Sequence, residues 1–328
     1  MIAEIKILYF KLYFFMVKYC YIFPSKTPSP SNYKDLKYIQ RSNVGSCEKN
    51  KLKPIPKIIW SYWDSPEFPK LVNDCINNTR IQNPDFNYII ITPQNLCEYL
   101  PDFPNHLKFP SIPYKSDYIR LSLLKKYGGI WMDITTVLTD SLNWILELQK
   151  RHRFDFFAFH NPAMMTENKG YPLIENWFIA ANTDSELLND WWTEFNDVSN
   201  TADPGKHYLG TPSFEEFSYN VPKQFHSYLT NHLSCQKILH SNKQYNYFLL
   251  SAIDEGMFYY YQSNSYRAYC MNLTIKSVKG KISKIIKLTG SDRREIAAFS
   301  KLGLMKKNSI FYKFNILTDQ DKELTNRI

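Results

Sequence analysis

One stretch of the sequence, SDYIRLSLLKKYGGIWMDITTVLT (116–139), constrains the fold more than any other. Ser116 and Asp117 are residue types that favour a helix N-cap, and the apolar residues after them follow a helical pattern. Two adjacent glycines then end the helix, because glycine adopts backbone conformations that other residues disfavour. The apolar residues 130–132 predict a short buried strand, and Asp133 follows it directly. The stretch therefore predicts a helix, a turn, a strand and a carboxylate at the end of the strand.

The place of Asp133 points to a ligand. An acidic residue that leaves a buried strand is costly unless it contacts a cation or hydrogen-bond donors. In α/β sheets, ligands bind at the carboxyl ends of the strands. Asp133 is therefore the first candidate for a functional residue, although an aspartate at this place can also simply cap the turn.

Further predicted strands and helices alternate along the chain. The predicted strands are 57–60, 86–92, 154–160 and 175–181, and the predicted helices are 69–78, 95–100 and 185–195. This alternation is typical of a mainly parallel sheet flanked by helices, so the predicted fold class is α/β.

The central stretch resembles the capsular polysaccharide synthesis family of glycosyltransferases. It is similar, more distantly, to DXD-containing yeast-type mannosyltransferases and clostridial glucosylating toxins, whose pattern is S-D-x-x-R followed by Y-G-G-x-(Y/W)-x-D-x-D. The matching positions are Ser116, Asp117, Arg120, Tyr127, Gly128, Gly129, Trp131, Asp133 and Thr135. Three more family-like blocks are P-K-I-I-W at 56–60, E-N-W-F-I-A at 175–180 and K-L-T at 287–289. The resemblance covers about residues 54–290.

The resemblance implies a GT-A-type fold and a metal-dependent enzyme. Such an enzyme would move a sugar from a nucleotide diphosphate sugar to a growing capsular or other surface polysaccharide, with retention of anomeric configuration. Two alternatives stay open: a toxin-like protein glycosyltransferase, and a catalytically silent glycan-binding protein. The one feature that favours the silent protein is Thr135, which stands where the pattern has its second aspartate.

The predicted metal site is centred on Asp133. A carboxylate repels a diphosphate directly, so Asp133 would act through Mn²⁺ or Mg²⁺, which take oxygen ligands. Thr135 would offer a hydroxyl to the same ion. His207, in the polar loop DPGKHYLGTP, is a further candidate ligand, although a loop histidine is more often simply exposed. Asn176 joins Asp133 as a candidate catalytic residue, because an amide both donates to and accepts from sugar hydroxyls.

The predicted donor site draws on residues around the first strand and the central helix. The resemblance implies that Asp117 and Arg120 hold the donor, and their spacing places them on one face of a helix. Trp60, Tyr62 and Trp63 follow the first strand, and at least one of them is expected to contact the nucleobase.

Two further features are assigned to substrate binding. Gly129 of the glycine pair is assigned to the donor site. The basic stretch 276–287 is a candidate to bind the donor diphosphate or a membrane-borne acceptor, although a solvated face is the default interpretation.

The composition favours anionic partners. The net charge of +9 suits nucleotide diphosphates, a lipid-linked glycan acceptor and peripheral contact with phospholipids. No zinc pattern, RNP motif or basic recognition helix supports binding of nucleic acid, so none is expected. The cysteines are scattered without a C-x-x-C pair, which fits a reducing compartment. The expected location is the cytoplasm, at the inner face of the plasma membrane.

The predicted domain organisation has four segments, namely 1–23, 24–53, 54–295 and 296–328. Segment 1–23 is apolar and aromatic, with Glu4, Lys11 and Lys18 at seven-residue spacing, so a helix there would be amphipathic. Such a helix suits the membrane interface and suits packing on its own domain equally well. Segment 24–53 is interpreted as a polar linker, 54–295 as the GT-A-type catalytic domain, and 296–328 as a C-terminal extension.

Overall fold

The computed structural model describes residues 12, 27–31, 38–41, 52–164, 171–241, 243–263, 265–301 and 303–318. The predicted amphipathic segment 1–23 lies outside the described residues except for Leu12, and so does the end of the predicted C-terminal extension from 319 onward. Within the described ranges, no helix is long and apolar enough to cross a membrane.

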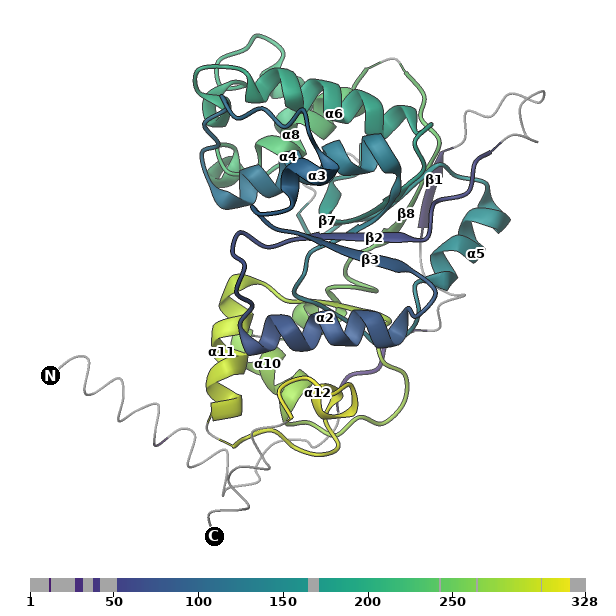
Figure 1. The fold of residues 1–328 in the computed structure, drawn as a ribbon, viewed down its shortest axis with the longest axis vertical. Helices are drawn as coiled ribbons and strands as arrows, with labels where there is room; N and C mark the ends of the chain where they lie inside the picture. The colour runs from purple at the N-terminus through teal and green to yellow at the C-terminus, as the bar shows by residue number, and fades with distance from the viewer. Residues whose placement is uncertain are drawn as a thin grey trace, which may run out of the picture.

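A seven-stranded sheet forms the centre of the described chain (Figure 1). Its strands in spatial order are β1 (Tyr38–Arg41), β8 (Tyr247–Ser251), β6 (Phe156–His160), β7 (Ile174–Ala181), β4 (Gly129–Met132), β2 (Ile58–Tyr62) and β3 (Asn87–Ile91). β2, β3, β4, β6 and β8 run in one direction, whereas β1 and β7 run in the other. The sheet is therefore mixed but largely parallel, which confirms the predicted α/β class.

Helices cover both faces of this sheet (Figure 1). The helices of the described ranges are α2 (Lys70–Gln82), α3 (Leu96–Tyr99), α4 (Ile112–Tyr127), α5 (Asn143–His152), α6 (Glu186–Ser199), α7 (Phe214–Ser218), α8 (Thr230–Leu239), α9 (Phe258–Tyr261), α10 (Tyr266–Thr274), α11 (Gly290–Lys301) and α12 (Ile310–Lys313), with short 3-10 turns at Pro204–Lys206 and Lys223–Phe225. α3, α4, α6 and α8 pack on one face, and α2 and α5 pack on the other.

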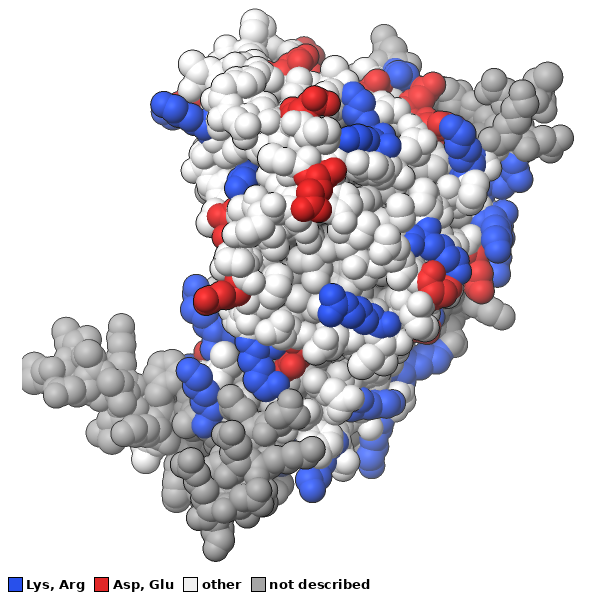
Figure 2. Space-filling view, in the orientation of Figure 1, with Lys and Arg blue, Asp and Glu red and all other residues white. Residues whose placement is uncertain are grey.

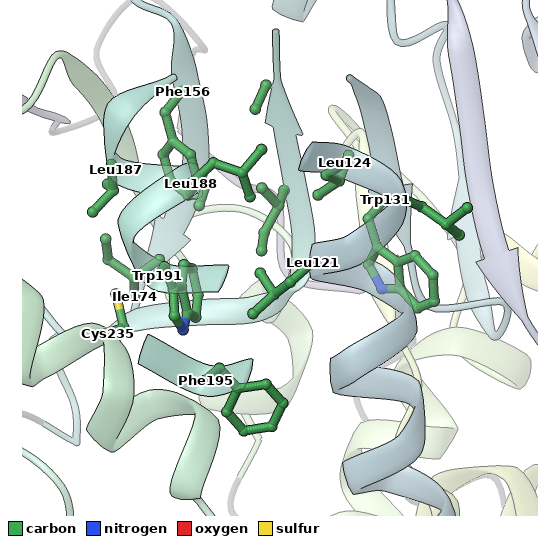
Figure 3. Packing of buried hydrophobic residues seen from close by; sticks show 14 of the residues in the cluster. Leu121, Leu124, Trp131, Phe156, Ile174, Leu187, Leu188, Trp191, Phe195 and Cys235 are labelled. Carbon is green, nitrogen blue, oxygen red and sulfur yellow. The ribbon is translucent and has the colours of Figure 1, made fainter. Parts of the chain in front are cut away.

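The core between the sheet, α4 and α6 fixes the helix that carries the central motif. Figure 3 shows Leu121 and Leu124 of α4, Trp131 of β4, and Trp191 and Phe195 of α6 within one apolar cluster. All five side chains are buried. Burial of each large apolar side chain stabilises the fold by about 1.5–3 kcal/mol. The orientation of α4 relative to β4 is therefore set by the core rather than by a ligand.

α4 begins earlier than the sequence predicts. Ser111 is its N-cap and accepts a hydrogen bond from the backbone N–H of Tyr114 at 3.3 Å, and Pro113 lies in the first turn. The prediction that Ser116 and Asp117 cap the helix was therefore wrong, because both lie in its second turn. There a side chain is not needed for capping and can face a neighbouring element instead.

The glycine pair ends α4 as predicted. Gly128 and Gly129 have φ angles of 65° and 102°, which favour glycine. A Cβ on Gly129 would lie 2.7 Å from the carbonyl oxygen of Ile58 in β2. Gly129 is thus required for the close packing of β4 against β2.

The segment interpreted as a linker contributes one strand to the sheet. β1 pairs with β8 at the sheet edge, and the Tyr38 ring stacks on Phe248 at 4.7 Å between centroids. Gln40 Nε2 also donates to the carbonyl oxygen of His152 at 2.8 Å. The four residues of β1 are mostly exposed, so no alternating apolar pattern marks them in the sequence.

A two-stranded ribbon lies beside the main sheet. In it β5 (Thr136–Leu138) pairs antiparallel with β9 (Ile285–Lys287), so that Thr136 is opposite Lys287. The ribbon packs with α10, α11 and α12 in a second apolar cluster. The predicted boundary at 295 falls inside α11, and buried residues beyond it, Phe299 and Phe311 among them, belong to that same cluster.

Charged side chains are unevenly spread over the face in Figure 2. Lys and Arg mix with Asp and Glu over the upper layer and the right-hand edge, whereas mainly basic side chains gather along the lower layer. The net charge of +9 is therefore not gathered in one patch on this face.

Candidate functional site

A cleft of about 520 Å³ opens where β2, β4 and β6 reach their carboxyl ends. The start of β7, the first turns of α4 and α8, and the segment from β9 into α11 complete its walls. Its charged lining residues are Asp64, Asp117, Arg120, Asp133, Glu175, Lys287 and Arg293. This is the sheet edge at which the sequence predicts a ligand.

Asp133 follows β4 and contacts two cations. Its Oδ1 accepts hydrogen bonds from Arg120 Nη2 at 3.0 Å and from Trp131 Nε1 at 3.2 Å. Its Oδ2 is bound by Lys287 Nζ, which comes from β9. Burial acts to raise the pKa of Asp133, but Lys287 and Arg120 together hold that pKa below its ordinary value. The carboxylate is therefore ionised and paired.

Arg120 joins Asp133 to a second carboxylate. Its Nη1 lies 2.9 Å from Asp117 Oδ1, and only 4% of its side chain is exposed. Asn176 Nδ2 donates to the same oxygen of Asp117 at 3.1 Å. Burial nevertheless outweighs these partners and raises the pKa of Asp117 to about 6. The structure thus brings together four predicted site residues, each of which lines the cleft.

The aromatic residues in and directly after β2 divide between core and cleft. Trp60 is buried, and its Nε1 donates to the carbonyl oxygen of Gly128 at 2.9 Å. Trp60 and Gly129 do not line the cleft, so the geometry assigns both predicted donor-site residues to packing. Tyr62 and Trp63 do line the cleft.

The Tyr62 hydroxyl donates to Asp64, whose Oδ1 also contacts Lys115 Nζ at 3.0 Å. Burial acts to raise the pKa of Asp64, but these two partners lower it overall. Arg293 lies over the Trp63 ring at 5.6 Å from its centroid. Tyr62 and Trp63 therefore each lie close to a cation, Lys115 and Arg293 respectively.

Lys287 is the one residue of the basic stretch 276–287 that lines the cleft among those the structure describes. Its backbone N–H donates to Gly256 O at 2.8 Å, and its carbonyl accepts from the Tyr269 hydroxyl at 2.6 Å. Its Nζ lies 5.5 Å from the centroid of the Trp177 ring. Backbone and side chain are therefore both held in place.

Three hydrogen-bonded polar residues that the sequence did not predict, Asn161, Glu175 and Tyr261, also line the cleft. Asn161 Nδ2 donates to Glu175 Oε1 at 2.6 Å, and the Tyr261 hydroxyl donates to Asn161 Oδ1 at 3.1 Å. Burial raises the pKa of Glu175 above its ordinary value. Asn161 directly follows β6, so the rule that singled out Asp133 would also have found it.

The residues around Asp133 do not fit a divalent metal as they are arranged. Both of its carboxylate oxygens are taken by donors, and the Thr135 hydroxyl donates to the carbonyl oxygen of Leu288 at 3.2 Å. His207 does not line the cleft, and its ring packs against Tyr208 at 5.0 Å. In the described part of the chain, no group of three or more His, Cys, Asp or Glu side chains is placed to hold a metal ion.

Sequence comparison places the chain among known proteins. Residues 31–279 match the family described as capsular polysaccharide synthesis protein. Inositol phosphoceramide mannosyltransferase 3 of Schizosaccharomyces pombe is 30% identical over 102 residues, which are 30% of this chain and 29% of that protein. Inositol phosphoceramide mannosyltransferase 1 of the same yeast is 29% identical over 91 residues, which are 25% of this chain and 28% of that protein. The match spans less than a third of these two relatives.

Solved structures show only a distant likeness. The catalytic domain of alpha-toxin from Clostridium novyi gives a TM-score of 0.33 at 11% identity, covering 60% of this chain and 66% of that chain. The UDP-bound glycosyltransferase domain of the YGT toxin gives 0.34 at 11% identity, covering 83% and 89%. Likeness at this level carries no argument about function. The family match covers most of the sequence, including the cleft residues from Tyr62 to Tyr261, and the chain belongs to the capsular polysaccharide synthesis protein family.

Proposed function

We propose that this protein is a glycosyltransferase that moves a sugar from a nucleotide diphosphate sugar to a growing capsular or other surface polysaccharide. The observation that carries the proposal is the position of Asp133, held between Arg120 and Lys287 at the ligand-binding edge of the sheet. The family of the chain and its similarity to mannosyltransferases support the same class of reaction.

The charges of the cleft suit a departing diphosphate. When the bond between the sugar and the diphosphate breaks, negative charge grows on the phosphate oxygens. Cations that are already fixed in place stabilise that charge without having to reorganise. Lys287 and Arg293 line the cleft, and α11 directs its N-terminus, at Gly290, toward the same space. These groups form the phosphate-binding side of the proposal.

The other lining residues suit the nucleoside and the sugar. Tyr62 and Trp63 offer aromatic faces for a base, and Asp117 and Asn176 offer acceptors and donors for hydroxyl groups. A volume of about 520 Å³ lies within the range of small-molecule sites. The GT-A type of fold and retention of anomeric configuration are parts of the proposal that follow from the sequence resemblance.

A panel of nucleotide sugars tests the proposal. The full chain is mixed with UDP-, GDP-, CDP-, ADP- and dTDP-linked sugars, and both the melting temperature and the release of nucleoside diphosphate are recorded. We expect one nucleotide class to raise the melting temperature and to be hydrolysed slowly without an acceptor. If no donor stabilises the protein or is hydrolysed, the proposal fails. Transfer to a protein rather than a glycan would favour the toxin-like alternative.

A further inference from the structure

We propose that the ammonium group of Lys287 takes the place of a divalent cation at Asp133, so that the chain binds its donor diphosphate without a metal ion. This inference rests on the proposed function and concerns how the same cleft holds the donor. It departs from the sequence-based expectation of Mn²⁺ or Mg²⁺.

Both carboxylate oxygens of Asp133 already accept from donors of the protein. Lys287 Nζ binds Oδ2, while Arg120 Nη2 at 3.0 Å and Trp131 Nε1 at 3.2 Å bind Oδ1. A divalent ion would have to displace Lys287 and would then lie beside two positive charges. Like charges at such short range repel, and the repulsion from Arg120 is poorly screened because its side chain is only 4% exposed. The site therefore favours the ammonium over the ion.

The charges of Asp133 and Lys287 balance each other without a metal ion. A pair of aspartates with a divalent cation carries no net charge. Here Thr135 replaces the second aspartate of the pattern, and Lys287 contributes a single positive charge to Asp133. One carboxylate with one ammonium is again neutral. Lys287 thus neutralises the single remaining aspartate without a metal.

The fold itself holds Lys287 in place, without a bound ligand. β9 pairs with β5, the Lys287 backbone is hydrogen-bonded to Gly256 and Tyr269, and only 14% of its side chain is exposed. A lysine held in this way provides a point charge at a defined place. Arg293 lines the same part of the cleft and supplies a second cation that a diphosphate can reach.

Calorimetric titration of the full chain with nucleoside diphosphates tests the inference. UDP, GDP, CDP, ADP and dTDP are titrated in EDTA and again with Mn²⁺ or Mg²⁺. We expect the best ligand to bind with dissociation constants that agree within about threefold in the two conditions. Lys287→Met should weaken binding in EDTA at least tenfold, because it removes the charge and keeps the apolar stem. Lys287→Arg should recover most of the affinity.

Lys284→Met is the matched control. Lys284 precedes β9, pairs with Asp140 and does not line the cleft, so its loss should leave nucleotide affinity unchanged. If the wild-type protein binds only with added metal, or if Lys287→Met binds as the wild type does, the inference is overturned while the proposed function stands. If no nucleoside diphosphate binds in either condition, the proposed function itself fails. Even if Lys287→Met does not fold, the wild-type affinities in EDTA and with added metal show whether binding needs a metal ion.

Discussion

The two ends of the β5–β9 ribbon each carry an aspartate paired with a lysine, yet their surroundings differ. At one end Asp133 and Lys287 have side-chain exposures of 26% and 14% and share the cleft with Arg120. At the other end Asp140 and Lys284 have exposures of 50% and 25% and lie outside the cleft. The same two residue types therefore form a partly buried pair inside a cleft and a more exposed pair on one ribbon.

Because both ends of the ribbon carry an aspartate–lysine pair, such a pair alone does not form a functional site. An exposed ion pair contributes little because water screens it, whereas a buried pair depends on every partner it has. The cleft end adds a second cation, a second carboxylate in Asp117 and aromatic walls. Each of these additions can be removed separately, and the results rank how much each contributes.

Removal of Arg120 should have the largest effect on stability. Arg120→Met removes the buried cation that the partly buried Asp117 and Asp133 share, and we expect a loss of about 3–5 kcal/mol in the free energy of unfolding. Urea unfolding measures the loss. Lys126→Met is the control, because Lys126 is an exposed residue of the same helix, and its loss should cost about 1 kcal/mol or less. Equal losses in the two variants would show that the cleft end is no more coupled than the surface.

Replacement of Asp117 should remove a pH dependence. The pKa of Asp117 is raised to about 6 in the fold by burial, against about 3.9 in an unfolded chain. Its contribution to stability is therefore fully present below the unfolded pKa and is lost as the pH rises through the folded pKa.

Relative to Asp117→Asn, the wild type should lose on the order of 1–3 kcal/mol between about pH 4 and pH 6.5. Urea unfolding of both proteins across this pH range measures the difference. A difference that stays constant with pH would mean that Asp117 is not the titrating group.

Trp63 tests whether the aromatic wall belongs to the donor site. Trp63→Ala should weaken binding of the best nucleoside diphosphate roughly tenfold, because stacking on a base contributes about 1–3 kcal/mol. Phe225→Ala is the control, since Phe225 is 43% exposed and does not line the cleft. Titration calorimetry compares the two variants, and unchanged affinity for Trp63→Ala would assign the base to another wall.

The surface pair should show the smallest effect. Asp140→Asn removes an ion pair that is largely exposed, so we expect the free energy of unfolding to fall by less than about 1 kcal/mol. Lys284→Met should give a similar small change. A loss as large as that of Arg120→Met would contradict the contrast between the two ends of the ribbon.

The sequence revealed the parts of the site that lie within short motifs, including Tyr62 and Trp63 after the first strand and Asn176 in the E-N-W block. Asp117, Arg120 and Asp133 are near each other in the chain, and a helix, a glycine turn and a strand are enough to bring them together. Lys287 lies 154 residues from Asp133 in the sequence, in the family-like block K-L-T. Only the pairing of β9 with β5 brings it to Asp133, and that pairing is a tertiary contact.

Other differences have similar local causes. Trp60 and Trp63 are close in sequence, but Trp60 lies within β2 and points into the core, whereas Trp63 follows the strand at the cleft. His207 was chosen as a histidine in a polar loop, and the sequence does not define the path of that loop. β1 was missed because four residues at a sheet edge carry no periodic pattern.

The most direct test of the account compares Asp133→Asn with Asp140→Asn in hydrolysis of the preferred nucleotide sugar. Each change removes one carboxylate charge from one Asp–Lys pair of the same ribbon. The two variants therefore carry the same chemical change and differ only in whether it lies inside or outside the cleft. The account predicts that folded Asp133→Asn loses about 100-fold or more in turnover, because the cleft cations are no longer held in place. Asp140→Asn should stay within about twofold of the wild type, as expected for a surface site. Wild-type turnover in folded Asp133→Asn would contradict the assignment of this cleft as the active site.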